Sequence, residues 1–189
     1  MLYIALLPLA FYVYFFKGLW LTHPIPCFRY LLSWWPALLA KLATFLLAPI
    51  VAPVSVFAKW ENLPPWLYWM QTHDDYLTPK YFLSTDWSPW EFPMNKWEEI
   101  WIRMRWLWRN PAYSFMHDVL GVKGQEFETI AGGTYYDRAE KTVQVQVADN
   151  AISVRGIIFW RVELWAGWKL VRRDRDGKRM LAMGIKLID

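Results

Sequence analysis

The sequence predicts an α+β membrane protein with an N-terminal transmembrane helical hairpin, Trp-rich interfacial helices and a small C-terminal antiparallel β-sheet. Three observations support this prediction. Residues 1–60 contain no Asp or Glu, and all seventeen acidic residues lie from Glu61 onward. The chain holds fifteen Trp and ten Tyr, ring types that a membrane interface favours. Beyond Gly121, apolar residues recur at every second position, which is the period of a strand. We therefore divide the chain into a hairpin (1–59), an aromatic interfacial helical region (60–121) and an antiparallel β domain (122–189).

The first predicted span covers residues 2–21. Residues 2–16 form an unbroken apolar run, and extension to residue 21 gives a helix long enough to cross a bilayer if Lys17 reaches the headgroups. A cleaved signal peptide is the competing interpretation. No basic segment precedes the run and no small-x-small cleavage site follows it, which favours a retained span.

The second predicted span covers residues 37–58, within an apolar stretch that three prolines and Lys41 interrupt. Either this segment crosses once, or its prolines break it into a re-entrant hairpin. Pro49 and Pro53 are four residues apart and share one helix face, so a kinked single crossing is favoured. A loop over Thr22–Arg29 would join the two spans and place both chain ends on one side. The absence of disulfides favours the cytoplasm for the bulk of the chain.

Tryptophans near the predicted span ends are expected at the membrane interface. These are Trp20, Trp34, Trp35, Trp60, Trp66 and Trp69. The net charge of +4 comes without a clustered basic face, so nucleic acid is not an expected partner. With Cys27 as the only cysteine and three scattered histidines, neither a metal site nor a cofactor is expected.

The densest polar cluster is Gln71-Thr72-His73-Asp74-Asp75. A histidine beside two carboxylates could bind a divalent metal or exchange protons, so His73, Asp74 and Asp75 are the catalytic candidates. Adjacent residues do not easily converge on one ion, and the same residue types close turns and cap helices. The structural interpretation is therefore favoured, and no phosphate loop, nucleophile elbow or paired-histidine motif accompanies the cluster.

The helical periodicity of residues 97–108 predicts an amphipathic helix, with Glu99 and Arg103 spaced as an i,i+4 pair. Asn110 and Pro111 are suited to cap and begin a following helix that Gly121 ends. Arg109 and Tyr113 have no such local role.

Four or five antiparallel strands are expected in the C-terminal part. Residues 127–136 and the alternating segment 142–147 supply the first two, and Asp149-Asn150 forms a turn. A long strand over 152–165, bent at Gly156, is expected to follow, then strands over 168–172 and 179–188.

Three segments resemble landmarks of an uncharacterised family of small membrane-associated proteins of tailed phages. They are LPPWLYWMQTHDDYL, WLWRNPAYSF and AGWKL, and the resemblance spans residues 62–170. It singles out Arg109, Asn110, Pro111, Tyr113, Trp168 and Lys169 as motif residues. His73 stands where members often have Pro, and Asp75 where Asn is common, which weakens a metal site built on His73. The resemblance implies a phage origin and a membrane location, but no known activity.

These observations predict a non-enzymatic, membrane-anchored phage accessory protein that contacts the bilayer of the host inner membrane and a host membrane or envelope component. Two alternatives stay open. One is an interfacial enzyme that acts on a lipid or envelope substrate through His73, Asp74 and Asp75. The other is a structural component of the virion.

Overall fold

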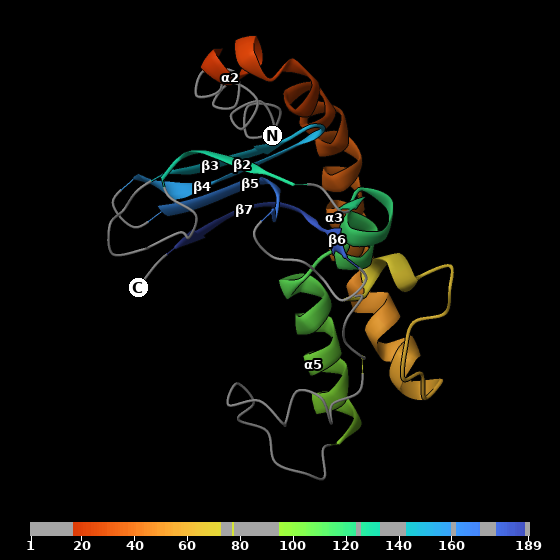
Figure 1. Ribbon diagram of the computed structural model, residues 1–189. Coiled ribbons are helices and arrows are strands. Elements are labelled where there is room, and N and C mark those ends of the chain that lie inside the picture. The colour runs from red at the N-terminus through yellow and green to blue at the C-terminus, as the bar shows by residue number, and fades with distance from the viewer. Residues whose placement is uncertain are drawn as a thin grey trace. The chain divides into compact units, whose positions relative to one another are not determined.

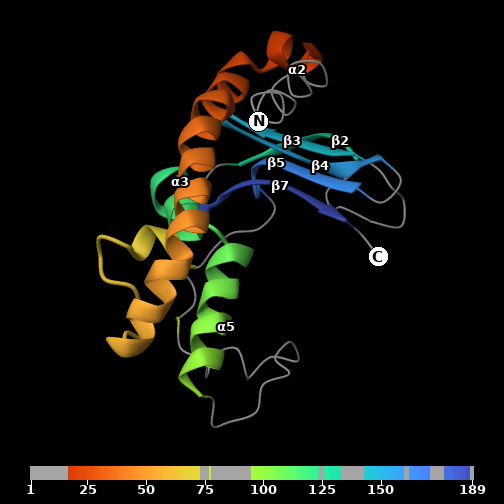
Figure 2. The same cartoon turned by 180° about the vertical axis from the view of Figure 1, so that it is seen from behind.

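The computed structural model describes residues 17–72, 77, 95–123, 126–132, 143–159, 162–170 and 177–187 (Figures 1 and 2). The α+β class is confirmed: a long apolar helix packs with a second helix, and a separate segment forms a five-stranded antiparallel sheet. The chain divides into two compact units. One, here the sheet unit, comprises Met1–Ser33 and Val122–Asp189, and the other, the helical unit, comprises Trp34–Gly121.

Helix α3 (Pro24–Phe57) follows the short helix α2 (Lys17–Thr22) after one non-helical residue, His23. The loop predicted over 22–29 is therefore wrong. Pro24 explains the narrow break, because proline disfavours the α conformation in the residue before it but fits the first turn of a helix. Residues 2–16 of the first predicted span lie outside the described residues, so the hairpin stays a prediction.

Three prolines lie inside α3 and do not end it: Pro36, Pro49 and Pro53. Proline lacks an N–H, so Pro49 cannot donate to the carbonyl of Phe45, four residues earlier. That carbonyl instead accepts a hydrogen bond from Nε1–H of Trp108, at 3.0 Å. A partner from another helix thus replaces a missing helical bond, and residues 30–57 form one helix that does not fold back on itself.

Helix α5 (Lys96–Arg109) is the amphipathic helix that the sequence predicts. Asn95 caps it: its side-chain oxygen accepts from the backbone N–H groups of Trp97 and Glu98, and the Glu98 carboxylate accepts from the N–H of Asn95. This reciprocal capping box fixes where the helix begins. The described residues of the helical unit also include the short helices η1 (Tyr68–Met70) and η2 (Phe115–Val119), the second a π-helix.

Helix α5 runs antiparallel along the C-terminal half of α3 (Figures 1 and 2). At one end, Lys96 lies over the ring of Phe57 at 5.2 Å from its centroid. At the other, the rings of Trp108 and Phe45 stack at 5.1 Å. The core between these ends consists of small and aliphatic side chains. It includes Ala48, Val51, Leu63, Leu67, Met70, Leu77 and Leu107, with a second cluster of Ala52, Val56 and Ile100.

The five-stranded sheet is an antiparallel meander in the order β2-β3-β4-β5-β7. Its strands are β2 (Glu128–Ala131), β3 (Gln144–Ala148), β4 (Ala151–Phe159), β5 (Val162–Trp168) and β7 (Leu181–Leu187). The two-residue strands β1 (Val122–Lys123) and β6 (Lys178–Arg179) pair separately. The turn predicted at 149–150 is confirmed, because Ala148 pairs with Ala151.

Two strand predictions are wrong. The segment 152–165 is not one strand: Phe159 pairs with Val162, so the chain reverses there and β4 and β5 form a hairpin. The predicted strand over 168–172 is also absent at its described residues, because Trp168 ends β5 and the next two residues are not in a strand. The reversal at Phe159 was not visible in the pattern, since no Gly, Pro, Asn or Asp stands between Phe159 and Val162.

The two faces of the sheet differ in chemistry. One carries the apolar core of the sheet unit, with Val147, Ile152, Val154, Ala166, Trp168 and Leu181 all buried. The other carries buried polar side chains: Gln144, Gln146, Ser153 and Glu163. On this polar face Arg155 forms an ion pair with Glu163 and lies over the ring of Trp165. A period-two pattern therefore predicts the strand here, but not that its polar face is buried too.

Candidate functional site

Two of the three sequence landmarks meet at Gln71. Its side-chain oxygen accepts from the N–H of Leu63 at 2.8 Å, and its side-chain nitrogen donates to Asn62 at 2.7 Å. Its backbone carbonyl accepts from the N–H of Ser114, also at 2.8 Å. Gln71 is fully buried. Its side chain therefore holds residues 62–72 together, and its backbone carbonyl ties this segment to Ser114, the N-cap of η2.

The candidate catalytic residues His73, Asp74 and Asp75 lie outside the described residues. Thr72, just before them, is buried, and so is Ser114. Within the described part of the chain, neither side-chain hydroxyl has a hydrogen-bond partner. His117 is also buried, and its Nδ1 lies 2.7 Å from the half-exposed carboxylate of Asp118.

A Ser-His-Asp composition suggests nucleophilic chemistry. A nucleophile must be reached by its substrate, however, and Ser114 has an exposed fraction of 0%. The cluster is better suited to holding the polypeptide than to catalysis.

Residues 109–113 form a corner between α5 and η2. The predicted role of Asn110 as the N-cap of a new helix is wrong. Asn110 is the C-cap of α5, with its N–H bonded to the Trp106 carbonyl at 3.0 Å, and it does not begin a new helix. Pro111 and the half-buried Tyr113 flank Ala112, which has a φ of 55°. A left-handed alanine breaks the helical path, which explains why Pro111 does not start a helix. Arg109 is exposed, with its guanidinium 5.9 Å from the Trp106 ring.

The third landmark, residues 167–169, joins the start of α3 to the sheet. Gly167 has a φ of 97°, and a Cβ placed there would lie 1.8 Å from the carbonyl oxygen of Ile152. Trp168 is fully buried, with Tyr30 edge-on to its ring at 6.1 Å and Arg29 over it at 5.6 Å. The Lys169 ammonium lies 5.2 Å from the Trp165 ring. These contacts give Gly167 and Trp168 a structural role.

Arg103 is a buried cation, and the sequence predicted only one of its hydrogen-bond partners. Its guanidinium donates to the Glu99 carboxylate at 2.7 Å, as the spacing predicts, and also to Oγ of Ser55 and the carbonyl of Trp60. Burial lowers the pKa of Arg103, while the charge of Glu99 and its hydrogen bond raise it. The side chain therefore clamps α5 to the C-terminal end of α3, and the long-range partners left no signal in local spacing.

The predicted interface tryptophans differ in exposure. Trp66 and Trp35 have exposed fractions of 69% and 45%, whereas Trp34 is buried at 6%. Trp20, Trp60 and Trp69 are half-buried. The structure adds two exposed tryptophans on α5 that were not singled out, Trp97 and Trp101. In the sequence both share the helical spacing of Ile100 and Met104, so periodicity alone groups them with buried side chains and gives no signal of their exposure.

Between Trp35 and Phe57, the exposed and the buried face of α3 differ in side-chain size. We call the exposed side chains the outer face: Trp35, Leu39, Leu42, Phe45, Leu46, Ile50, Val54 and Phe57. The inner face is buried and, apart from Val51 and Val56, carries small side chains: Ala37, Ala40, Thr44, Ala48, Ala52 and Ser55. The hydroxyls of Thr44 and Ser55 donate to carbonyls of the same helix, at 2.9 and 2.8 Å.

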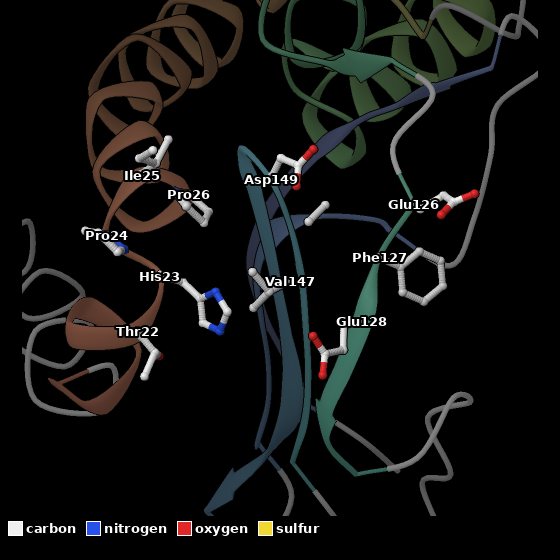
Figure 3. A pocket seen from close by; sticks show the side chains of 11 residues that line it. Thr22, His23, Pro24, Ile25, Pro26, Glu126, Phe127, Glu128, Val147 and Asp149 are labelled. Atoms are coloured by element: carbon white, nitrogen blue, oxygen red, sulfur yellow. The ribbon is translucent and has the colours of Figure 1, made fainter.

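A pocket of about 500 Å³ lies in the sheet unit, between the α2–α3 junction and the β2–β3 edge (Figure 3). Its wall carries three carboxylates, those of Glu126, Glu128 and Asp149, and the imidazole of His23. Among the described residues, no group of three or more His, Cys, Asp and Glu side chains is arranged to hold a metal ion. The pocket therefore offers negative charge without a defined ligand.

Residues 22–189 match the model of a family described as a family of unknown function, DUF7338. Residues 62–170, over which the phage-family resemblance extends, lie inside this match. The match makes no statement about phages or membranes. No curated protein and no solved structure matches the chain.

Proposed function

We propose that this chain, which belongs to the DUF7338 family of unknown function, is a membrane-attached protein that acts by binding another membrane or envelope component. The observation that carries the proposal is the outer face of α3. Large apolar side chains cover this face and remain exposed, whereas the face that packs on protein is built from small residues.

This distribution is the opposite of what a helix of a water-soluble protein shows. Such a helix turns its large apolar side chains into the core, because their burial drives folding. In lipid that driving force is absent, so helices pack through small residues and present large apolar ones to the acyl chains. The hydroxyls of Thr44 and Ser55 also bond within their own helix, as polar groups in an apolar medium must.

Length and charge agree with membrane attachment. Helix α3 is the one helix in the described part of the chain that is long and apolar enough to cross a bilayer, and only 28% of its most apolar window is buried. A core helix of a soluble protein also meets the length criterion, but it would be mostly buried. The only formal charges in α3 are the cations Arg29 and Lys41, whose long side chains can reach headgroups.

The finer parts of the proposal rest on the sequence. The resemblance to phage proteins supports an accessory role during infection, and the absence of cysteine pairs supports a cytoplasmic location for the bulk. A membrane span over residues 2–21 is retained as part of the proposal. Binding rather than catalysis is supported by the burial of Thr72, Ser114 and His117, which leaves this polar cluster inaccessible to a substrate.

Fractionation of cells that express the full-length chain tests the attachment. We expect the protein in the membrane pellet after an alkaline wash, and in solution only when detergent is added. Recovery in the soluble fraction without detergent would overturn the proposal.

Purification from infected cells in mild detergent tests the binding role. A host envelope protein enriched with the wild type but lost with Trp66→Ala, an exposed aromatic position, would support it. The proposal would be contradicted if the protein kept its effect on infection while no envelope protein was enriched with it. It would also be contradicted if His73→Ala abolished that effect at an unchanged membrane level and fold, because that result favours an interfacial enzyme.

A further inference from the structure

The C-terminal half of α3 has a charged helix beside it. From Phe45 to Phe57, α3 is flanked by α5, whose ends are fixed by the Trp108–Phe45 stack and by Lys96 over the Phe57 ring. Helix α5 carries six ionisable side chains in fourteen residues. Because charged side chains are costly in hydrocarbon, this half of α3 cannot lie at the centre of a bilayer with α5 attached.

The N-terminal end of α3 is also engaged with protein. Tyr30 and Arg29 pack on the ring of Trp168 in the sheet unit. Residues 34–44 of α3 lie between these two contacts, and they extend about 16 Å at 1.5 Å per residue. That is roughly half of the 30 Å hydrocarbon thickness, so the stretch between the two engaged ends is too short to cross.

We infer that α3 lies along the membrane plane and that α5 presents a surface for anionic phospholipid headgroups beside it. This deepens the proposed function and rests on it. The surface consists of a ring series, Phe45–Trp108–Trp101, flanked by basic residues of α5. Trp101 lies edge-on to Trp108 at 6.3 Å and Trp108 stacks on Phe45 at 5.1 Å, so the series runs without a break from α5 onto the outer face of α3.

The charges on this surface have one sign. The exposed ionic residues of α5 are Lys96, Arg105 and Arg109. Its two carboxylates are half-buried and engaged, Glu98 with the N–H of Asn95 and Glu99 with Arg103. A helix with exposed tryptophans and outward cations is suited to the interface of an anionic membrane. Each cation near such a surface raises its affinity about fivefold, so three contribute on the order of a hundredfold.

Spin labels on the full-length chain test this inference. In a Cys27→Ala background, one label replaces Trp101 and another replaces Leu46, and each protein is reconstituted in two kinds of vesicle. One kind is phosphatidylcholine alone, and the other is an equal mixture of phosphatidylcholine and phosphatidylglycerol. Accessibility to a water-soluble and to a lipid-soluble relaxation agent gives the depth of each label.

The Trp101 label should lie at headgroup depth on the mixed vesicles and move into water on phosphatidylcholine alone. The variant Lys96→Gln/Arg105→Gln/Arg109→Gln should abolish that difference, whereas Lys123→Gln, an exposed cation of β1, should preserve it. A Trp101 label in water on both vesicles, with Leu46 in lipid, would overturn the inference and leave membrane attachment intact. A Trp101 label in the hydrocarbon centre would overturn it in favour of a crossing, and both labels in water would overturn the proposed function as well.

Discussion

The Arg103 side chain connects three segments at a point that is almost closed to water. It has an exposed fraction of 3% and donates to Ser55, Trp60 and Glu99. Removing a buried charge leaves its partners without donors, and breaking such a pair costs about 3–5 kcal/mol.

We therefore expect Arg103→Ala to lower the free energy of unfolding by about 3–5 kcal/mol. Arg105→Ala is the matched control: the residue is exposed on the same helix, so its change should stay within about 0.5 kcal/mol. Thermal unfolding in detergent, followed by near-ultraviolet circular dichroism of the tryptophans, measures both. Equal stabilities of the two variants would contradict the clamp.

Three glycines of the sheet unit allow a graded test of the landmark at residue 167. Gly184 has an ordinary φ and open space, Gly177 has a φ of 75° and open space, and Gly167 has a φ of 97° and a carbonyl in the way. A left-handed conformation costs an L-residue about 1–2 kcal/mol, and overpacking adds about 1–3 kcal/mol.

Alanine substitutions should therefore destabilise in the order Gly184, Gly177, Gly167, with the last costing roughly 2–5 kcal/mol. Denaturation of the three single variants under one set of detergent conditions gives the order. A Gly167→Ala variant as stable as Gly177→Ala would show that the close approach to Ile152 does not constrain the site.

Single residues also show what the sequence could predict. The spacing of Glu99 and Arg103 predicted their ion pair, because neighbours on a helix surface meet regardless of the rest of the fold. The other partners of Arg103 lie more than forty positions away in the sequence, and local spacing contains no such information. The same reason explains why Gln71 was noticed as part of a polar cluster but not as the link to Ser114.

At the scale of elements, α3 depends on a neighbour to pass through Pro49. The carbonyl that proline leaves without its helical donor is bonded by Trp108 of α5. Trp108→Phe keeps an aromatic ring for stacking on Phe45 but removes the donor, so it should cost about 1–2 kcal/mol.

Pro49→Ala restores a backbone N–H to α3 and supplies the missing donor. The effect of Trp108→Phe should therefore be smaller in a Pro49→Ala background, with a coupling of about 0.5–1 kcal/mol in a double-mutant cycle. Chemical denaturation of the four proteins in detergent gives this coupling. Strict additivity would mean that the indole bond does not compensate for the proline.

Elements with strong local signals were predicted, and those without them were not. Helix α5 has both a helical period and an Asn95 cap, and the turn at 149–150 has its characteristic residues. The β4–β5 hairpin reverses between Phe159 and Val162 without any turn residue, so alternation alone merged two strands into one. The loop predicted over 22–29 is wrong because Pro24 fits the first turn of α3, which begins there.

At the scale of the whole molecule, charge distribution and hydrophobic periodicity predicted the α+β class and an apolar N-terminal region. The structure adds which face of α3 is covered. Residue type alone could not show this, because large and small apolar residues are interspersed along α3. The packing of α5 and residues 60–72 determines the inner side of its C-terminal half. The candidate catalytic residues 73–75 stay a prediction, as does the phage accessory role.

The central claim is that the outer face of α3 contacts lipid, and labels along that face test it most directly. In the Cys27→Ala background, single cysteines at Leu39, Leu46 and Val54 would carry a spin label in the full-length chain reconstituted in vesicles. We predict that all three labels are accessible to oxygen, shielded from a water-soluble relaxation agent and similar in depth. Three labels that are fully accessible to the water-soluble agent would contradict the claim.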